Sequence, residues 1–138
     1  MQIRPYEATD EAAVIALWIE CGLTRPWNDP KRDIARKLTE QPELFLVGEV
    51  GSRIVATAMV GFDGHRGWVH YLGVLPSSQG LGFGRRIMAQ AERLLIERGC
   101  PKLNLQVRAS NQGVIAFYEA LGYQVDEVVG MGRRLIPD

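Results

Sequence analysis

The sequence predicts a mixed α+β (α/β) fold in which a central, twisted, mostly antiparallel sheet of about seven strands carries helices on its faces. The periodic patterns occur in the order strand, two helices, three strands, helix, strand, helix, two strands. The three consecutive strands predict an antiparallel meander. A length of 138 residues, with 46% hydrophobic and 23% charged residues, suffices for one core and leaves no room for a second. We therefore expect one domain, residues 1–138.

The N-terminal part is expected to hold one strand and two helices. The side chains of residues 2–6 show the pattern of a short strand. Thr9 or Asp10 is a suitable N-cap for the helix that follows. Gly22 suits the residue just after the end of that helix. A second short helix is expected to begin near Pro30, after a segment that two prolines interrupt.

The middle of the chain reads as three strands. Residues 44–50 and 53–62 are apolar, β-branched runs separated by a Gly-Ser turn, so they predict a hairpin. Residues 68–75 form a third run that stops at Pro76. The clearest helix of the chain follows a glycine-rich loop after this run.

The C-terminal part is expected to continue the sheet. Residues 103–107 predict a strand, and Asn111 is a suitable N-cap for a helix that ends at Gly122. Residues 123–129 and 131–136 predict two closing strands.

Charge and cysteine content exclude several classes of protein. Sixteen Lys and Arg balance sixteen Asp and Glu, so no global field attracts nucleic acid or an anionic membrane. No leader pattern and no apolar run of about eighteen residues is present, and we expect a cytoplasmic protein without a membrane partner. Cys21 and Cys100 form no CxxC or zinc-type spacing, so we expect no metal.

The glycine-rich loop between the third strand of the meander and the clearest helix carries the chemistry. A helix N-terminus offers unpaired backbone N–H groups and a positive dipole end, so residues 79–86 suit an anion such as a pyrophosphate. No Lys-Ser/Thr pair follows the glycines, which argues against a nucleoside triphosphatase, and the spacing GxGxG differs from the dinucleotide pattern. A glycine turn needed only for positive φ angles is the structural alternative.

Two motifs resemble those of the GNAT (Gcn5-related) N-acetyltransferases. The first, LGVLPSSQGLGFGRRIM, is similar to the family's acetyl-CoA-binding motif, with Gln79, Gly82 and Gly84 at its characteristic positions. The second, NLQVRASNQGVIAFYEALGY, is similar to the later strand and helix, and its matching residues are Asn111, Tyr118, Gly122 and Tyr123. Val114 replaces the usual alanine. The length and two loop segments further resemble the YpeA-type bacterial subgroup.

The resemblance implies a binding site for acetyl-CoA as the acetyl donor. Backbone N–H groups of residues 81–85 would hold the pyrophosphate, and the strand edge at residues 72–75 would pair with the pantetheine arm. The N–H of Val74 would point at the thioester oxygen, and Asn111 would add a contact besides its cap. The implied donor-binding residues are Leu72, Gly73, Val74, Leu75, Gln79, Gly80, Leu81, Gly82, Phe83, Gly84, Arg85, Asn111 and Tyr118.

Tyr118 is the expected general acid. Its phenol could protonate the departing CoA thiolate, as the resemblance implies. On spacing alone, a tyrosine in an apolar stripe with Phe117 and Leu121 is more often a packing residue.

The general base is less defined, because the segment Trp68-Val69-His70-Tyr71 lacks the carboxylate that many family members carry there. His70 and Glu49 are the two candidates that we rank first. Strand alternation predicts that His70 shares a face with Trp68, Leu72 and Val74. A structural histidine is the alternative.

Acceptor recognition is expected from the loop between the first two helices and from the loop before the third meander strand. The candidate residues are Trp27, Asn28, Asp29, Asp63 and His65. Burial of Trp27 under its loop and a plain turn at Asp63 are the structural alternatives.

The implied activity is direct transfer of an acetyl group from acetyl-CoA to an amine in a ternary complex. The acceptor is a small-molecule amine or a protein amino group, and the protein is a monomer or a homodimer. Neither cysteine lies in a nucleophile motif, which argues against an acetyl-cysteine route. The alternatives are a non-catalytic acyl-CoA sensor of the same fold and a module that binds another diphosphate.

Overall fold

The computed structural model describes residues 1–138, which form two compact units: residues 1–105 with Asp138, and residues 106–137. The first unit contains β1 (Gln2–Pro5), α1 (Glu11–Glu20), α2 (Pro30–Lys37), β2 (Phe45–Val50), β3 (Arg53–Phe62), β4 (Gly67–Val74), α3 (Phe83–Glu97) and β5 (Leu103–Leu105). Short 3₁₀ turns lie at Ala8–Asp10, Pro42–Leu44 and Pro76–Ser78. The second unit contains α4 (Gln112–Ala120).

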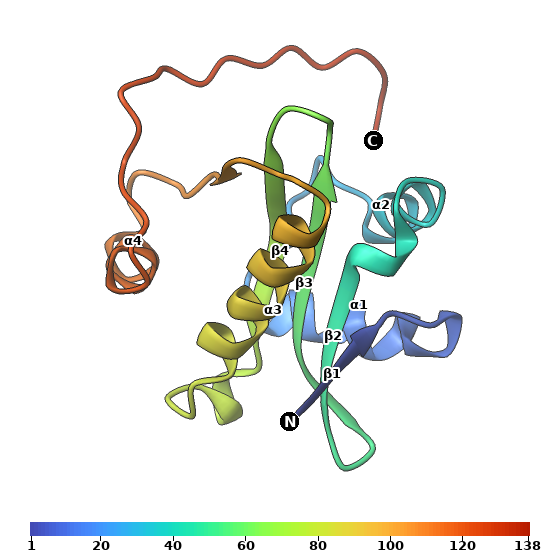
Figure 1. Cartoon of the computed structure of the whole chain (residues 1–138). Coiled ribbons are helices and arrows are strands. Elements are labelled where there is room, and N and C mark those ends of the chain that lie inside the picture. Colours follow the sequence, from blue (N-terminus) through green and yellow to red (C-terminus); the bar gives the residue numbers. More distant parts are fainter. The chain divides into compact units, whose positions relative to one another are not determined.

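The sheet has five strands in the order β1-β2-β3-β4-β5 (Figure 1). The first four strands pair antiparallel, which confirms the predicted meander, and β5 pairs with β4 in parallel. The register of β5 covers only Gly67–Val69 of β4. The second half of β4 therefore has no strand on its outer edge.

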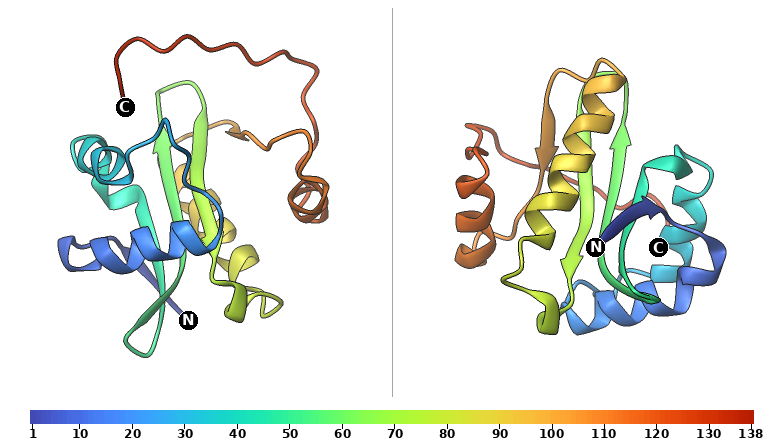
Figure 2. Two further views of the ribbon diagram at one scale, coloured as in Figure 1. Left: turned by 180° about the vertical axis from the view of Figure 1, so that it is seen from behind. Right: turned by 60° about the horizontal axis from the view of Figure 1, so that its bottom comes forward.

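Helices α1 and α3 cover opposite faces of the sheet (Figure 2). A Cβ atom added at Gly73 of β4 would lie 3.0 Å from Leu17 of α1, whereas one added at Gly67 would lie 2.7 Å from Leu95 of α3. Both helices thus pack closely on the backbone of the same strand, so a larger side chain at either glycine would have to displace Leu17 or Leu95.

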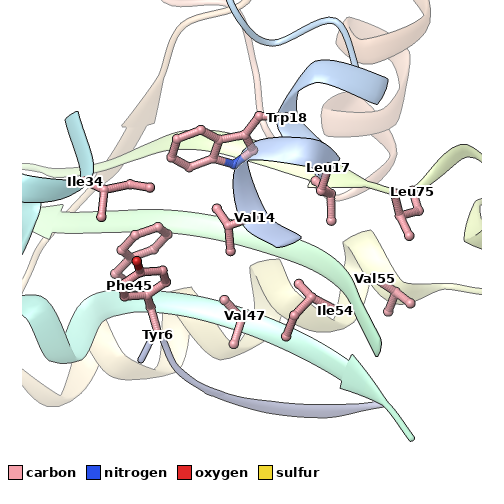
Figure 3. Close-up of a cluster of buried hydrophobic side chains, with 10 residues drawn as sticks. All are labelled: Tyr6, Val14, Leu17, Trp18, Ile34, Phe45, Val47, Ile54, Val55 and Leu75. Carbon is pink, nitrogen blue, oxygen red and sulfur yellow. The ribbon is translucent and has the colours of Figure 1, made fainter. Parts of the chain in front are cut away.

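The core on the α1 face joins α1, α2 and the strands. Figure 3 shows its buried side chains, which are Tyr6, Val14, Leu17, Trp18, Ile34, Phe45, Val47, Ile54, Val55 and Leu75. The rings of Tyr6 and Phe45 stack at 4.6 Å. Burial of each large apolar side chain contributes about 1.5–3 kcal/mol, which is what holds α1 against the sheet.

A bulge in β4 reverses the predicted faces of its second half. Met59 of β3 pairs with His70, but Thr57 pairs with Gly73, so two residues of β4 oppose one of β3. At the bulge, Tyr71 has φ +53°, and its ring stacks on Trp18 of α1. The prediction that His70 shares a face with Leu72 and Val74 is wrong, because the extra residue turns Tyr71, Gly73 and Leu75 toward α1 instead.

The helix ends follow the glycine pattern. After α1, α3 and α4 the chain turns at Gly22, Gly99 and Gly122, each with positive φ. Directly after Gly22, for example, the N–H of Leu23 donates to the carbonyl of Trp18 at 2.9 Å. Asp10 occupies the N-cap position of α1, as predicted, but its side chain makes no cap bond, because its carboxylate accepts from the backbone N–H of Glu7 and from Arg4.

The two predicted closing strands at residues 123–129 and 131–136 are wrong, so the sheet has five strands rather than about seven. A strand is stable only when its backbone pairs and one face is buried. Here the apolar side chains of the segment are exposed, namely Val125, Val128, Val129, Met131, Leu135 and Ile136. The strand at residues 103–107 is likewise shortened to β5, which ends where its pairing with β4 ends.

None of the helices combines the length and the apolar character that crossing a membrane requires.

Candidate active site

The glycine-rich loop makes two sharp backbone turns before α3. Gly80 and Gly82 both have φ +82°, and Gly82 is the N-cap of the helix. A Cβ atom at either position would meet nothing within 4 Å, so it is the left-handed backbone, rather than crowding, that requires glycine. The side chain of Leu81 between them is exposed.

The first turn of α3 presents free amides. Gly82 has no side chain to cap the helix, and the first helical bond of the backbone runs from Arg86 N–H to the carbonyl of Gly82 at 3.1 Å. The N–H groups of residues 83–85 therefore have no helical partner. Arg85 is exposed, while the guanidinium of Arg86 donates to the carbonyl of Met1. This geometry fits an anionic group such as a diphosphate.

The open edge of β4 lies just before this loop. Leu75 N–H donates to the carbonyl of Val55 at 2.9 Å, so Leu75 faces β3. Because alternate residues of a strand present their backbone groups to opposite sides, the N–H of Val74 faces away from β3, where β5 does not reach. An extended, amide-bearing arm can add to such an edge as another strand does.

Two side chains donate hydrogen bonds to the carbonyl of Val74. Gln79 Nε2 donates to it at 3.1 Å, and the thiol of Cys21, which follows α1, donates at 3.3 Å. Burial raises the pKa of the Cys21 thiol, so it stays protonated as a donor. These bonds fix the peptide that precedes the loop, and they give the motif glutamine Gln79 a structural task.

The bulge of β4 is held by a buried chain of hydrogen bonds. Trp18 Nε1–H donates to Thr57 Oγ1 at 3.0 Å, and the Thr57 hydroxyl donates to the carbonyl of Tyr71 at 2.8 Å. Thr57 is fully buried, and the ring of Tyr71 stacks on Trp18 at 3.8 Å. A bulky residue with positive φ costs about 1–3 kcal/mol, which these contacts offset.

The hydroxyl of Tyr71 reaches the neighbouring helix and loop. It donates to Asp33 Oδ2 of α2 at 2.6 Å, and the side chain of Asn28 lies close enough to lower the pKa of the phenol in part. Burial first, and the bond to Asp33 second, raise the pKa of Tyr71 well above its usual range. The predicted acceptor residue Asn28 therefore lies beside two residues that the sequence did not single out.

His70 lies next to Tyr71 and on the same face. Its ring stacks parallel to that of Trp68 at 6.4 Å, and its side chain retains solvent access. Desolvation first, and then the positive charge of Lys37, lower the pKa of His70, while Asp33 partly opposes them. The neutral ring is thus the dominant form at neutral pH, as a proton acceptor requires.

Glu49 lies two strands away and is already paired. Its carboxylate accepts from Arg4 at 2.7 Å, and the same guanidinium holds both oxygens of Asp10 at 2.8 and 2.9 Å. The structure thus places the two candidate bases apart, His70 on β4 and Glu49 on β2.

The remaining predicted acceptor residues have local structural partners. Asp63 accepts from the backbone N–H groups of His65 and Arg66 at 2.8 and 2.7 Å, which is a turn. Asp29 caps α2 by accepting from the N–H of Lys31. The side chain of Trp27 is about half exposed, at 51%, rather than buried under its loop.

The second unit carries the predicted general acid. Tyr118 of α4 is buried and contacts Phe117 and Tyr123 edge-on, with ring centroids 5.1 and 5.7 Å away. Burial alone raises its pKa to about 12, so the phenol keeps its proton at neutral pH. Asn111 caps α4, with its Oδ1 accepting from Val114 N–H at 3.3 Å, as predicted.

Sequence reasoning missed Thr57, Tyr71 and Asp33. A signal existed for Thr57, which is a lone hydroxyl in the apolar run RIVATAMVGF. No signal existed for the bulge, because a residue pattern does not show which strand residue is left unpaired. Across the whole chain, no group of three or more His, Cys, Asp or Glu side chains is arranged to hold a metal ion.

Comparisons with known proteins agree with these features. The model of the acetyltransferase (GNAT) family matches residues 12–123. An acetyltransferase of Yersinia enterocolitica is 51% identical over 138 residues, which are 100% of this chain and 98% of the relative.

Two solved structures share the fold. The ribosomal-protein-S18-alanine N-acetyltransferase of Escherichia coli has a TM-score of 0.73 and 28% identity, covering 88% of this chain and 76% of that one. The PaiA N-acetyltransferase of Thermoplasma acidophilum in complex with coenzyme A has a TM-score of 0.82 and 17% identity, covering 94% and 92%. The family match and the identity to curated relatives, together with these structures, show that the chain belongs to the GNAT family and is an N-acetyltransferase.

Proposed function

We propose that the protein transfers an acetyl group from acetyl-CoA directly to an amine while both substrates are bound. The observation that carries this proposal is the free first turn of α3 directly after the unpaired edge of β4. The amides of residues 83–85 would hold the pyrophosphate, and the edge at residues 72–74 would pair with the pantetheine amides. The thioester supplies an activated acetyl group when the donor is bound.

The residues of this chain supply three further tasks. The N–H of Val74 would stabilise the negative charge that develops on the acetyl oxygen. His70, neutral at neutral pH, would accept the proton that the acceptor ammonium must lose. Tyr118, which keeps its proton, would protonate the sulfur when its bond to the acetyl carbon breaks. We favour His70 over Glu49 as the base because the Glu49 carboxylate is already paired with the guanidinium of Arg4.

Thermal unfolding with acetyl-CoA, CoA and ATP tests the donor assignment. A ligand at a hundred times its Kd stabilises the folded state by about 2.7 kcal/mol, and we expect this for both CoA species and not for ATP. Gly82→Ala should weaken the effect, because alanine strains the left-handed N-cap. Stabilisation by ATP alone would contradict the assignment.

An acceptor screen tests the transfer itself. Release of the CoA thiol is followed with small amines and with peptide and protein amino groups as acceptors. Thiol release that depends on the amine supports direct transfer. Stabilisation by acetyl-CoA without release for any acceptor would instead favour a non-catalytic acyl-CoA sensor.

A further inference from the structure

The strongest unassigned feature is the contact between the bulge of β4 and α2. Tyr71 is an aromatic residue in the left-handed region, and Thr57 and Trp18 hold it there. Strain of this kind persists only where surrounding contacts over-determine it, and such positions gather at functional sites. The strained residue brings its hydroxyl to Asp33 and close to Asn28, on the face of the sheet that α1 covers.

Asp33 can bind a further cation in this setting. Its Oδ2 accepts from Tyr71 at 2.6 Å and its Oδ1 from Arg36 at 3.2 Å, and each carboxylate oxygen has a second lone pair. The side chain of Asp33 is 23% exposed, so it is accessible to a solute. The other acidic residue at this end of α2, Asp29, is engaged in the helix cap.

We propose that Asp33, with the hydroxyl of Tyr71 and the side chain of Asn28, forms a subsite that binds the acceptor as a protonated primary amine. This inference rests on the proposed acetyl transfer. A primary amine is an ammonium ion near neutral pH, so a carboxylate recruits it in its abundant form. One ammonium proton then passes to the adjacent His70, and the nitrogen lone pair bonds to the acetyl carbon. The carbon–sulfur bond breaks with its electron pair left on sulfur, and the second ammonium proton balances the protonation of that thiolate, so the products are the amide and the free CoA thiol.

A pair of isosteric acceptors tests the subsite. n-Propylamine is protonated at neutral pH, whereas O-ethylhydroxylamine has the same shape and is neutral. In Asp33→Asn the amide oxygen still accepts from Tyr71, but the negative charge is lost. We expect kcat/KM for n-propylamine to fall roughly 10- to 100-fold, the range for hydrogen bonds to charged groups, and that for O-ethylhydroxylamine to stay within about twofold.

Two matched variants sharpen the result. Arg36→Gln removes the cation that competes for Asp33 and should lower KM for n-propylamine. Glu40→Gln removes one negative charge from an exposed position after α2. It should leave kcat/KM unchanged for both acceptors. Thermal unfolding with acetyl-CoA reports in parallel that fold and donor binding are intact in each variant.

The outcomes separate the subsite from the activity. Equal loss for both acceptors in Asp33→Asn, or no loss for n-propylamine, overturns the subsite and leaves the acetyl transfer standing. Absence of transfer to both acceptors in the unmodified protein overturns the subsite, whereas absence of transfer to every acceptor of the screen, with acetyl-CoA still stabilising the protein, overturns the proposed direct transfer.

Discussion

Two residues of this acetyltransferase have pKa values displaced in opposite directions, each toward the protonation state that its proposed task requires. Desolvation keeps Tyr118 protonated, and desolvation together with Lys37 keeps His70 neutral. Desolvation disfavours the charged form in both cases, which means the anion for a phenol and the cation for an imidazole. One physical cause thus prepares a proton donor and a proton acceptor.

Replacement of Tyr118 by Phe tests the proton donor. The ring keeps its packing against Phe117 and Tyr123, so we expect unchanged affinity for acetyl-CoA. The kcat should fall about 10²-fold or more, because only protonation of the leaving thiolate is lost. Steady-state kinetics with a thermal-shift measurement of Kd checks both. An unchanged kcat, with chemistry shown to limit the rate, would reduce Tyr118 to a packing residue.

The pH profile tests His70. The base must be neutral, and its pKa lies below the ordinary 6.5. Therefore kcat/KM should fall in acid as the ring gains a proton, with an apparent pKa below 6.5. In His70→Gln the plateau should drop about 10²-fold and this acid limb should disappear. Persistence of the same limb in the variant would assign it to another group, and Glu49→Gln is the comparison to make next.

At the scale of elements, the bulge of β4 determines which side chains reach α1 and α2. Without it, strand alternation would point Leu72 and Val74 at α1; with it, Tyr71, Gly73 and Leu75 take that face. The sheet therefore presents two consecutive polar side chains, His70 and Tyr71, to the same side.

Thr57→Val tests whether the buried hydroxyl maintains the bulge. Valine has nearly the same shape, but it leaves Trp18 Nε1–H and the carbonyl of Tyr71 without their partner. We expect a loss of about 1–3 kcal/mol in the free energy of unfolding for each unpaired buried group, measured in denaturant, and a raised acceptor KM. Thr57→Ser should restore both. A valine variant with unchanged stability and unchanged acceptor KM would show that stacking of Tyr71 on Trp18 is sufficient to maintain the bulge.

At the scale of the whole molecule, global stability should depend on pH through Asp10. The hydrogen bond from Arg4 lowers the pKa of Asp10 below its ordinary 3.8, against an opposing effect of burial. The stabilisation is then fully present above pH 3.8 and is lost as pH falls through the lowered folded value. Asp10→Asn should cost about 1–3 kcal/mol at pH 7, and the difference from the unmodified protein should shrink in acid.

Urea titrations at several pH values measure this difference. The exposed Arg93–Glu97 pair is the control, since its atoms lie 3.9 Å apart and Glu97→Gln should cost less than about 1 kcal/mol at any pH. A difference for Asp10→Asn that does not change with pH would show that its role is packing rather than charge.

Much of the site could be predicted from local sequence. A helix start and a glycine-rich turn are short-range features, so Gly82 and the amides of residues 83–85 follow from adjacent residues. Gly22 and Asn111 are found in the same way. The two closing strands were wrong because Val125 and its neighbours have a strand's composition but neither a pairing partner nor a buried face.

The sequence by itself determined the order of helices and strands as far as α4, the antiparallel meander, the glycine-rich start of α3 and the family. These depend on interactions between residues close in the chain, or on motifs that local spacing defines. Only the tertiary structure decided that Thr57 and Trp18 hold Tyr71 in the bulge, that Tyr71 reaches Asp33, and that Arg4 occupies Glu49. Each of these contacts joins residues far apart in the sequence or depends on strand register, which packing sets and which residue spacing alone does not reveal.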